Sequence, residues 1–301
     1  MIDRLAVPNH KIDIVIDTDT FNEVDDQFAL TYALGSEDKL NVVGIYAAPF
    51  QNVKAETSEI GMEKSYEEIH KILKLLKKEE YGACVKKGSR TFLKDENTPV
   101  HSEAVDHLIS LSHNYSKENP LYVVGLAAIT DIASCLLLDP SIAERIVVVW
   151  LGGYGQHYKD ADEFNLRQDV AGVRVVFESE VPLIQIPCRG VVSDFRISKS
   201  ELLEWVNGKS EIGSYLTHIV IEEAEQYAKG TPWTRVLWDV VAVAWLLNEK
   251  ECFMEERIIP RVNVSYEKQY EYPETKARMK YIYYVNRDAL MKDLFQKICK
   301  F

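Results

Sequence analysis

The chain has 301 residues and carries 47 acidic against 35 basic side chains, which gives a formal net charge of −12. Hydrophobic residues make up 47% and charged residues 27%, a composition that excludes disordered, collagen-like and disulfide-scaffold chains. So acidic a surface repels phosphate backbones and anionic lipids, and we therefore expect neither a nucleic acid nor a membrane partner. No apolar run reaches the roughly 20 residues that a membrane-spanning helix requires.

The five cysteines are scattered along the chain and form no Cys-x-x-Cys pair. An odd, scattered set is typical of reduced thiols and not of a disulfide framework. The first ten residues also lack the basic start and apolar run of a secretory signal peptide. We therefore expect a cytoplasmic protein.

Short, continuous apolar runs rich in Val and Ile recur through the first two thirds of the chain. They cover residues 12–16, 40–48, 121–124, 145–151 and 182–186. Such runs predict strands that are buried on both faces of a parallel sheet. Between them, apolar residues recur at helical spacing over residues 26–34, 57–77, 101–112, 127–138 and 201–206. This alternation predicts an α/β fold with a doubly wound, mainly parallel sheet flanked by helices.

The later part of the chain is more helical. The patterns predict helices over residues 212–227, 237–247 and 287–301, and strands over residues 258–265 and 278–286, the second of which fits a late hairpin. No linker rich in Pro, Ser or Gly divides the chain. We therefore expect a single domain over residues 1–301.

A group of aspartates follows the first predicted strand. Asp17 and Asp19 stand two residues apart, hence on one side of the strand, and Asp25 and Asp26 begin the next helix. In an open parallel sheet, ligands bind beyond the carboxyl ends of the strands. Carboxylates this close repel one another unless a cation neutralises them, and oxygen ligands suit Ca²⁺ or Mg²⁺ better than zinc. The pattern favours a cation site; the alternative is a helix cap with solvated neighbours.

Three further positions carry weaker signals. Leu151 ends a predicted strand and precedes Gly-Gly, which by itself indicates a plain turn. Glu163 and Asn165 stand two residues apart, so that they can share one polyol ligand, although such a triplet is more often a loop with a buried aromatic. Asp239 opens a strongly apolar helix, where an N-cap is the simpler interpretation.

Taken together and in this order, the motifs resemble those of the inosine-uridine-type nucleoside hydrolases. The matching segments are Asp17-Thr-Asp19 with Asp25-Asp26, Asn52 after the second predicted strand, Gly125-Leu-Ala-Ala-Ile-Thr130-Asp131, Leu151-Gly-Gly, Glu163-Phe-Asn165 and Trp238-Asp239. The resemblance covers residues 12 to about 247. Each motif is weak by itself, but their shared order and spacing make a strong signal.

The resemblance implies an enzyme of nucleoside salvage that hydrolyses the N-glycosidic bond of ribonucleosides with calcium-bound water, without a covalent intermediate, as a dimer or tetramer. The Ca²⁺ ligands implied are Asp19, Asp26, the backbone carbonyl of Thr130, and Asp239. The implied contacts to the ribose hydroxyls are Asp25, Asn52, Glu163 and Asn165. Asp19 would also activate the water, Asp17 would support the cluster from behind, and Leu151 would line the sugar pocket.

Two features depart from the family pattern. Five residues separate Asp19 from Asp25 where three are common, which makes Asn22 and Glu23 alternative ligands. Trp238 stands where many members carry a His that is associated with protonating or orienting the leaving base. Because Trp can only donate a hydrogen bond or stack on a flat ring, the chain resembles a divergent member of the family.

Contacts to the leaving base must therefore come partly from elsewhere. Tyr227, Trp233 and Arg235 are candidates, because the Gly-Thr-Pro segment among them predicts a mobile loop that closes over a ligand. Ordinary packing at the end of a helix is the equally good alternative for these residues.

Two other functions stay open. The segment Asp17-Thr-Asp19 is also similar to the start of haloacid-dehalogenase-type phosphatases, which use Mg²⁺, but Phe21 stands where Thr or Val is expected. A non-hydrolytic nucleoside- or ribose-binding protein on the same scaffold would account for the missing His.

Overall fold

The computed structural model describes residues 4–301, so the first three residues of the expected domain lie outside the described part. Within that part, the central sheet has eight strands in the order β3-β2-β1-β4-β5-β6-β12-β9. These strands are β1 (Ile12–Thr18), β2 (Leu40–Ala47), β3 (Val85–Lys87), β4 (Leu121–Gly125), β5 (Ile146–Leu151), β6 (Leu183–Ile186), β9 (Met254–Pro260) and β12 (Arg278–Val285). All neighbours pair in parallel except β9, which runs antiparallel to β12. The predicted doubly wound α/β fold is confirmed.

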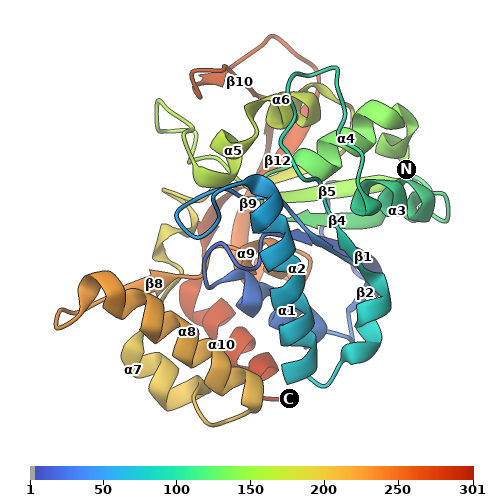
Figure 1. The fold of residues 1–301 in the computed structure, drawn as a ribbon. Helices are drawn as coiled ribbons and strands as arrows, with labels where there is room; N and C mark the ends of the chain where they lie inside the picture. Colours follow the sequence, from blue (N-terminus) through green and yellow to red (C-terminus); the bar gives the residue numbers. More distant parts are fainter. Residues whose placement is uncertain (1–3) are drawn as a thin grey trace.

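Helices cover both faces of this sheet (Figure 1). The helices that pack on one face are α1 (Asp26–Leu34), α2 (Ser58–Leu75), α9 (Val240–Trp245) and α10 (Arg287–Ile298), with α7 (Lys199–Glu201) and α8 (Glu211–Ala228) farther out. Those on the other face are α3 (Glu103–Ser112), α4 (Thr130–Leu138) and α6 (Val170–Glu178). No helix within residues 4–301 has the length and apolar character needed to cross a lipid bilayer.

The two-sided cover explains why the strands appear in the sequence as unbroken apolar runs. Along β1, Ile14 and Ile16 enter one hydrophobic core, and Val15 between them enters the other. Side chains alternate between the faces of a strand, so a strand covered on both faces must be apolar at every position.

The order of the sheet reverses at β1. The chain runs from β1 outward through β2 to β3, and then returns to place β4 on the other side of β1. Connections on the two sides of such a point leave a crevice at the carboxyl ends of the strands, which is where ligands bind in open parallel sheets. The Asp17–Asp26 segment leaves the sheet at this crevice.

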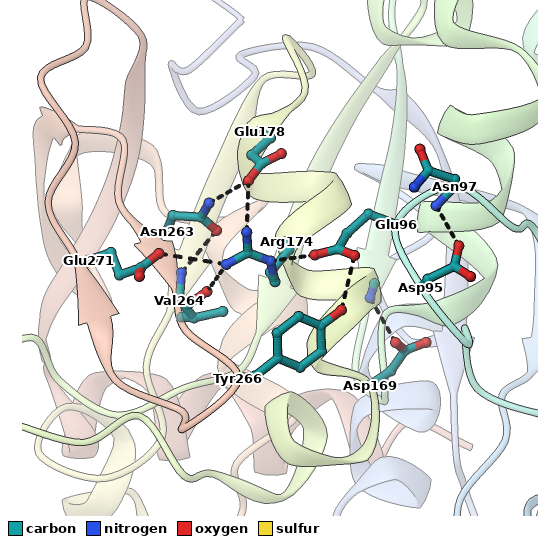
Figure 2. A network of polar contacts seen from close by, with 11 residues as sticks. Asp95, Glu96, Asn97, Asp169, Arg174, Glu178, Asn263, Val264, Tyr266 and Glu271 are labelled. Atoms are coloured by element: carbon teal, nitrogen blue, oxygen red, sulfur yellow. Dashed lines mark hydrogen bonds and ion pairs between the residues drawn. The ribbon is translucent and has the colours of Figure 1, made fainter.

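Short strand pairs tie the long loops to this frame. β7 (Arg196–Ser198) pairs antiparallel with β8 (Thr234–Val236), which joins the segment after β6 to the segment before α9. β10 (Asn263–Val264) and β11 (Tyr270–Glu271) form a second ribbon. Arg174 of α6 anchors that ribbon, because it pairs with Glu271 as well as with Glu96 and Glu178 (Figure 2).

Several element boundaries differ from those that the patterns predict. β9 begins at Met254 and ends at Pro260, whereas the patterns predict a strand over residues 258–265; proline lacks the N–H that the next ladder bond needs. The helix predicted over residues 201–206 is α7 followed by one π-helical turn over Leu202–Val206. β3 was not predicted, because three residues are too few to show a period.

Candidate active site

A cavity of about 520 Å³ opens at the carboxyl ends of β1, β4, β5 and β6. The segment between β8 and α9 and the short helix α5 (Phe164–Gln168) complete its wall. The lining residues are Asp19, Asn22, Glu23, Asp25, Asp26, Leu126, Leu151, Tyr154, Tyr158, Glu163, Phe164, Asn165, Arg167, Cys188, Arg189, Ser193, Arg196, Trp238 and Asp239. The cavity thus unites segments that are more than 200 residues apart in the sequence.

Three aspartates gather in this cavity. Asp25 and Asp239 occupy the N-cap positions of α1 and α9, but neither side chain makes a hydrogen bond that caps its own helix. One oxygen each of Asp25, Asp26 and Asp239 lies within 4.8 Å of the other two, and all three residues are buried. Asp25 Oδ2 instead accepts the backbone N–H of Trp238 at 2.8 Å, which joins α1 to the start of α9. The capping interpretation therefore does not account for the Asp239 side chain.

Asp19 brings a fourth buried carboxylate to the same cavity. Its Oδ2 has no hydrogen-bond partner among the described residues. Burial raises the pKa of Asp19 well above its usual range, and the negative charges of Asp26 and Asp25 raise it further. Burial also raises the pKa of Asp25 to about 7 and that of Asp26 to about 6.

The donor set fits a hard divalent cation. Within residues 4–301, no lysine or arginine forms an ion pair with Asp19, Asp25, Asp26 or Asp239; the charge of Arg235 lowers the pKa of Asp25 without direct contact, and burial outweighs it. Isolated buried carboxylates are strongly disfavoured unless a counter-charge compensates them. Several carboxylate oxygens facing one point are the usual ligands of Ca²⁺.

A second group of polar side chains lies at the ends of β4 and β5. Glu163 accepts hydrogen bonds from the backbone N–H groups of Asn165 at 3.0 Å and Gly153 at 3.1 Å. Asn165 donates its amide hydrogens to the carbonyls of Leu126 at 2.8 Å and Leu151 at 3.1 Å. The amide oxygen is then the remaining polar atom of Asn165. Both side chains are therefore held in the cavity wall by hydrogen bonds to the backbone.

Two of the expected site residues lie behind the wall. Thr130 begins α4 and its hydroxyl donates to Asp169 at 2.6 Å, while Leu126, directly after β4, lines the cavity instead. Asp17, which is expected to support the cluster from behind, does not line the cavity either, and its pKa is raised by burial and by the charge of Asp131. Because β1 ends at Thr18, the regular alternation of side chains along the strand does not extend to Asp19. Asp17 and Asp19 therefore need not share one side, as the sequence predicts for a continuous strand.

The longer loop after Asp19 changes which other residues reach the cavity. Asn22 and Glu23 of this loop line the cavity, and Asn52 donates to Asn22 Oδ1 at 2.7 Å from outside the wall. Arg235 and Tyr227 also lie outside the wall. Arg235 pairs with Glu23 at 3.2 Å and donates to the Tyr227 hydroxyl at 2.9 Å. Asn52 and Arg235 thus contact residues of the wall, Tyr227 contacts Arg235, and none of the three lines the cavity.

The remaining expected residues line the cavity, together with some that no motif marked. Leu151, Glu163, Asn165 and Trp238 are in the wall, as the sequence predicts. The wall also contains aromatic residues after β5 and arginines after β6, which sequence reasoning missed. The one available signal was Arg189, three residues after the end of β6, and it is weak because solvated loops also carry single charged residues.

Comparison with known proteins decides the family. A family model described as inosine-uridine preferring nucleoside hydrolase matches residues 14–292. The chain belongs to the inosine-uridine preferring nucleoside hydrolase family. It is therefore an enzyme of the ribonucleoside hydrolase class, and neither a phosphatase nor a non-hydrolytic binder is favoured.

Individual members of the nucleoside hydrolase family resemble this chain over most of its length. The pyrimidine-specific ribonucleoside hydrolase RihA of Salmonella typhi is 26% identical over 246 residues, which are 71% of this chain and 77% of RihA. The structure of a purine-preferring ribonucleoside hydrolase from Gardnerella vaginalis superposes with a TM-score of 0.76 and 21% identity. The match covers 96% of this chain and 98% of the Gardnerella chain. A plant nucleoside hydrolase covers 96% of this chain, with 99% of its own length covered, a TM-score of 0.75 and 17% identity. The two structures share the fold.

Proposed function

We propose that this nucleoside hydrolase cleaves ribonucleosides into ribose and free base at a calcium site formed by Asp19, Asp26 and Asp239. The aspartate cluster carries the proposal. Two N-cap aspartates leave their helices uncapped and place their oxygens within 4.8 Å of each other and of Asp26. Such an arrangement of buried charges needs a cation, and it stands at the crevice where the fold binds ligands.

The chemistry needs a site that stabilises positive charge on the sugar and delivers water to C1′. N-glycosidic cleavage passes through an oxocarbenium-like sugar, which buried carboxylates around the ring stabilise. When bound, the divalent cation lowers the pKa of a water molecule. Asp19, whose Oδ2 has no hydrogen-bond partner among the described residues, would accept the proton of the attacking water. The water oxygen bonds to C1′ as the C1′–N bond breaks, and the electron pair of that bond leaves with the base.

Other wall residues hold the substrate. Asp25, Glu163 and Asn165 offer oxygen acceptors to the ribose hydroxyls, which fixes the sugar for attack. Leu151 borders the sugar, and the ring of Trp238 provides a surface for stacking of the base. Asn52 acts through Asn22, whose side chain it contacts.

The proposal also includes the substrate class, the cellular location and the oligomeric state of the enzyme. The substrate is a small nucleoside, and the enzyme works in the cytoplasm as a homo-oligomer, either a dimer or a tetramer. All five cysteines are free, which supports a reducing compartment. Exposed apolar side chains on the edge pair β9–β12, such as Ile258 and Tyr284, support a contact between subunits.

Release of ribose, measured as reducing sugar, tests the proposed function. Inosine and uridine are both assayed, because the relatives named above differ in base preference. We expect release with calcium, loss after EGTA, and recovery when calcium is returned. The Asp19→Ala variant should lose roughly 10²–10⁴-fold in rate, the usual contribution of a general base, while its circular dichroism spectrum stays unchanged.

Asp38→Ala is the matched control, because Asp38 is an exposed aspartate that does not line the cavity. It should keep the full rate. Turnover by Asp19→Ala at the wild-type rate would contradict the role of Asp19. Nucleoside binding without any ribose release would contradict the hydrolase mechanism itself.

A further inference from the structure

Three arginines line the cavity, although the protein as a whole carries a net charge of −12. Arg167 lies in α5, Arg189 follows β6, and Arg196 begins β7. All three are exposed, so their guanidinium groups are accessible from the cavity mouth. A neutral nucleoside offers no group that calls for three positive charges.

These arginines differ from others nearby in their partners. Arg235, just outside the wall, is neutralised by Glu23 and Glu223, and Arg174 is surrounded by three glutamates (Figure 2). By contrast, none of the cavity arginines forms an ion pair with a carboxylate within residues 4–301. Their positive charge is available to a ligand.

The contacts that these side chains do make hold them in place and leave donors free. The Arg189 guanidinium lies 4.5 Å from the ring centre of Tyr158 and 5.7 Å from that of Tyr154. The Arg167 guanidinium lies 5.3 Å from the ring centre of Phe164. A guanidinium held over an aromatic ring keeps its N–H groups available for an anion.

Two of the arginines are connected to the residues that would hold the ribose. Arg167 follows Asn165 by two residues in the same short helix, and Glu163 is the N-cap of that helix. Tyr154, beneath Arg189, directly follows Gly153, whose backbone N–H donates to Glu163. Arg189 lies over Tyr154 and the charge of Arg167 also acts on Tyr154, so two of the three positive charges lie beside segments that are expected to hold the sugar hydroxyls, which points to an anion attached to the sugar.

We infer that Arg167, Arg189 and Arg196 bind a phosphate on the ribose, and that the preferred substrates are ribonucleoside 5′-monophosphates. This inference rests on the proposed function and narrows its substrate class. Guanidinium groups bind phosphate oxygens with paired, charge-assisted hydrogen bonds. They also offset the repulsion between a phosphate and the buried carboxylates of the cavity.

The reaction keeps the phosphate ester intact. The oxygen of water forms a bond to C1′ and the C1′–N bond breaks, with its electron pair going to the base nitrogen. Asp19 takes one water proton, the base gains one proton in its place, and the hydroxyl stays on C1′. The products are ribose 5-phosphate and the free base, without oxidation or reduction.

Wild-type enzyme with calcium gives the first test. Free uracil or hypoxanthine is measured by chromatography from uridine, uridine 5′-monophosphate, inosine and inosine 5′-monophosphate. We expect kcat/KM for each monophosphate to exceed that for its nucleoside by about tenfold or more, the scale of one charge-assisted hydrogen bond. No inorganic phosphate should appear, and ribose 5-phosphate should inhibit more strongly than ribose.

Variants give the second test. Arg167→Ala, Arg189→Ala and Arg196→Ala should each lower the ratio of monophosphate to nucleoside kcat/KM by about tenfold. Arg257→Ala is the matched control, because Arg257 is exposed and also lies over two tyrosines, Tyr281 and Tyr283, but does not line the cavity. It should keep the wild-type ratio.

The outcomes separate this inference from the function on which it rests. If the enzyme releases base from the nucleosides with equal or higher kcat/KM than from the monophosphates, the inference is overturned and the proposed function stands. If no substrate releases base, the proposed function fails first. Orotidine, which carries a carboxylate on the base, is assayed as a further substrate. If the enzyme prefers orotidine to uridine but shows no preference for monophosphates, the arginines bind the base and the ribose-phosphate assignment is overturned.

Discussion

Asp25 and Asp239 show how two ordinary sequence features become a site. Each occupies the position where an aspartate usually caps a helix, and capping is worth about 1 kcal/mol. Other helices of this chain use that interaction; Thr57 and Ser102, for example, cap α2 and α3. In α1 and α9 the carboxylates instead face each other. The two helices thus lose a cap, and the cavity gains carboxylate oxygens that lie within 4.8 Å of one another, the arrangement on which the proposed cation site rests.

At the residue scale we predict that calcium stabilises the protein more at high pH than at low pH. Burial raises the pKa of Asp25 to about 7 and of Asp26 to about 6, above the value of about 4 in an unfolded chain. Because these two pKa values are higher in the folded state, the carboxyl groups contribute their full stabilisation of the fold below about pH 4. That contribution to the free energy of unfolding is lost as the pH rises through 6 and 7. Calcium binds the ionised carboxylates and restores that stability.

Thermal unfolding between pH 5 and 8, with saturating calcium or with EGTA, measures this effect. The increase in Tm due to calcium should grow with pH, and at 100 times Kd the added stability is about 2.7 kcal/mol. Asp239→Asn should show a smaller increase at every pH, because it removes one charged ligand. An increase in Tm that does not depend on pH would contradict the assignment of these carboxylates.

At the element scale, the packing of α2 depends on a glycine. A Cβ atom on Gly61 would lie 2.0 Å from the backbone oxygen of Phe50, which follows β2. Alanine normally stabilises a helix relative to glycine by about 0.5–1 kcal/mol. Here the clash with backbone must push α2 away from the sheet, so the sign reverses.

We therefore predict that Gly61→Ala destabilises the protein by about 1–3 kcal/mol or more, the cost of overpacking. The midpoint of urea unfolding measures the loss. Gly82→Ala is the control, because its nearest neighbour would be His70 Cε1 at an ordinary 3.5 Å, and we expect its stability to stay within about 0.5 kcal/mol of wild type. Equal urea midpoints for the two variants would contradict this prediction, because α2 would then shift without any loss of stability.

The elements also show where sequence patterns succeed. The runs at β1, β2, β4 and β5 were predicted because burial on both faces demands an apolar residue at every position. β3 was missed because it has three residues, and the loop after β6 because irregular backbone has no period. The Arg189 and Arg196 contributions to the cavity lie in those aperiodic stretches.

At the scale of the whole molecule, the two ends of the chain share one core. Ile12 of β1 and Ile298 of α10 belong to the same hydrophobic cluster. The Tyr32 hydroxyl of α1 also donates to Asp293 of α10. Because α1 carries Asp26 at its start, the closing helix supports the helix that carries the aspartate cluster.

We predict that the described chain unfolds as a single domain. Tryptophan fluorescence and far-ultraviolet circular dichroism should give coincident urea midpoints, and the calorimetric and van't Hoff enthalpies should agree, since no linker separates one core from the other. Two resolved transitions would show instead that the chain contains separately folding units.

The sequence by itself determined the class of fold, the family and the most important carboxylates. Those features are local: an apolar run needs only its own neighbours, and Asp19, Asp25 and Asp26 follow one strand. Tertiary structure decided which residues share the cavity. It placed Asp239 beside Asp25, left Thr130 out of the cavity lining, and brought three arginines into that lining. The physical reason is that strand order and loop conformation set the distances between remote segments. Neither can be read from the local spacing of apolar residues in the sequence.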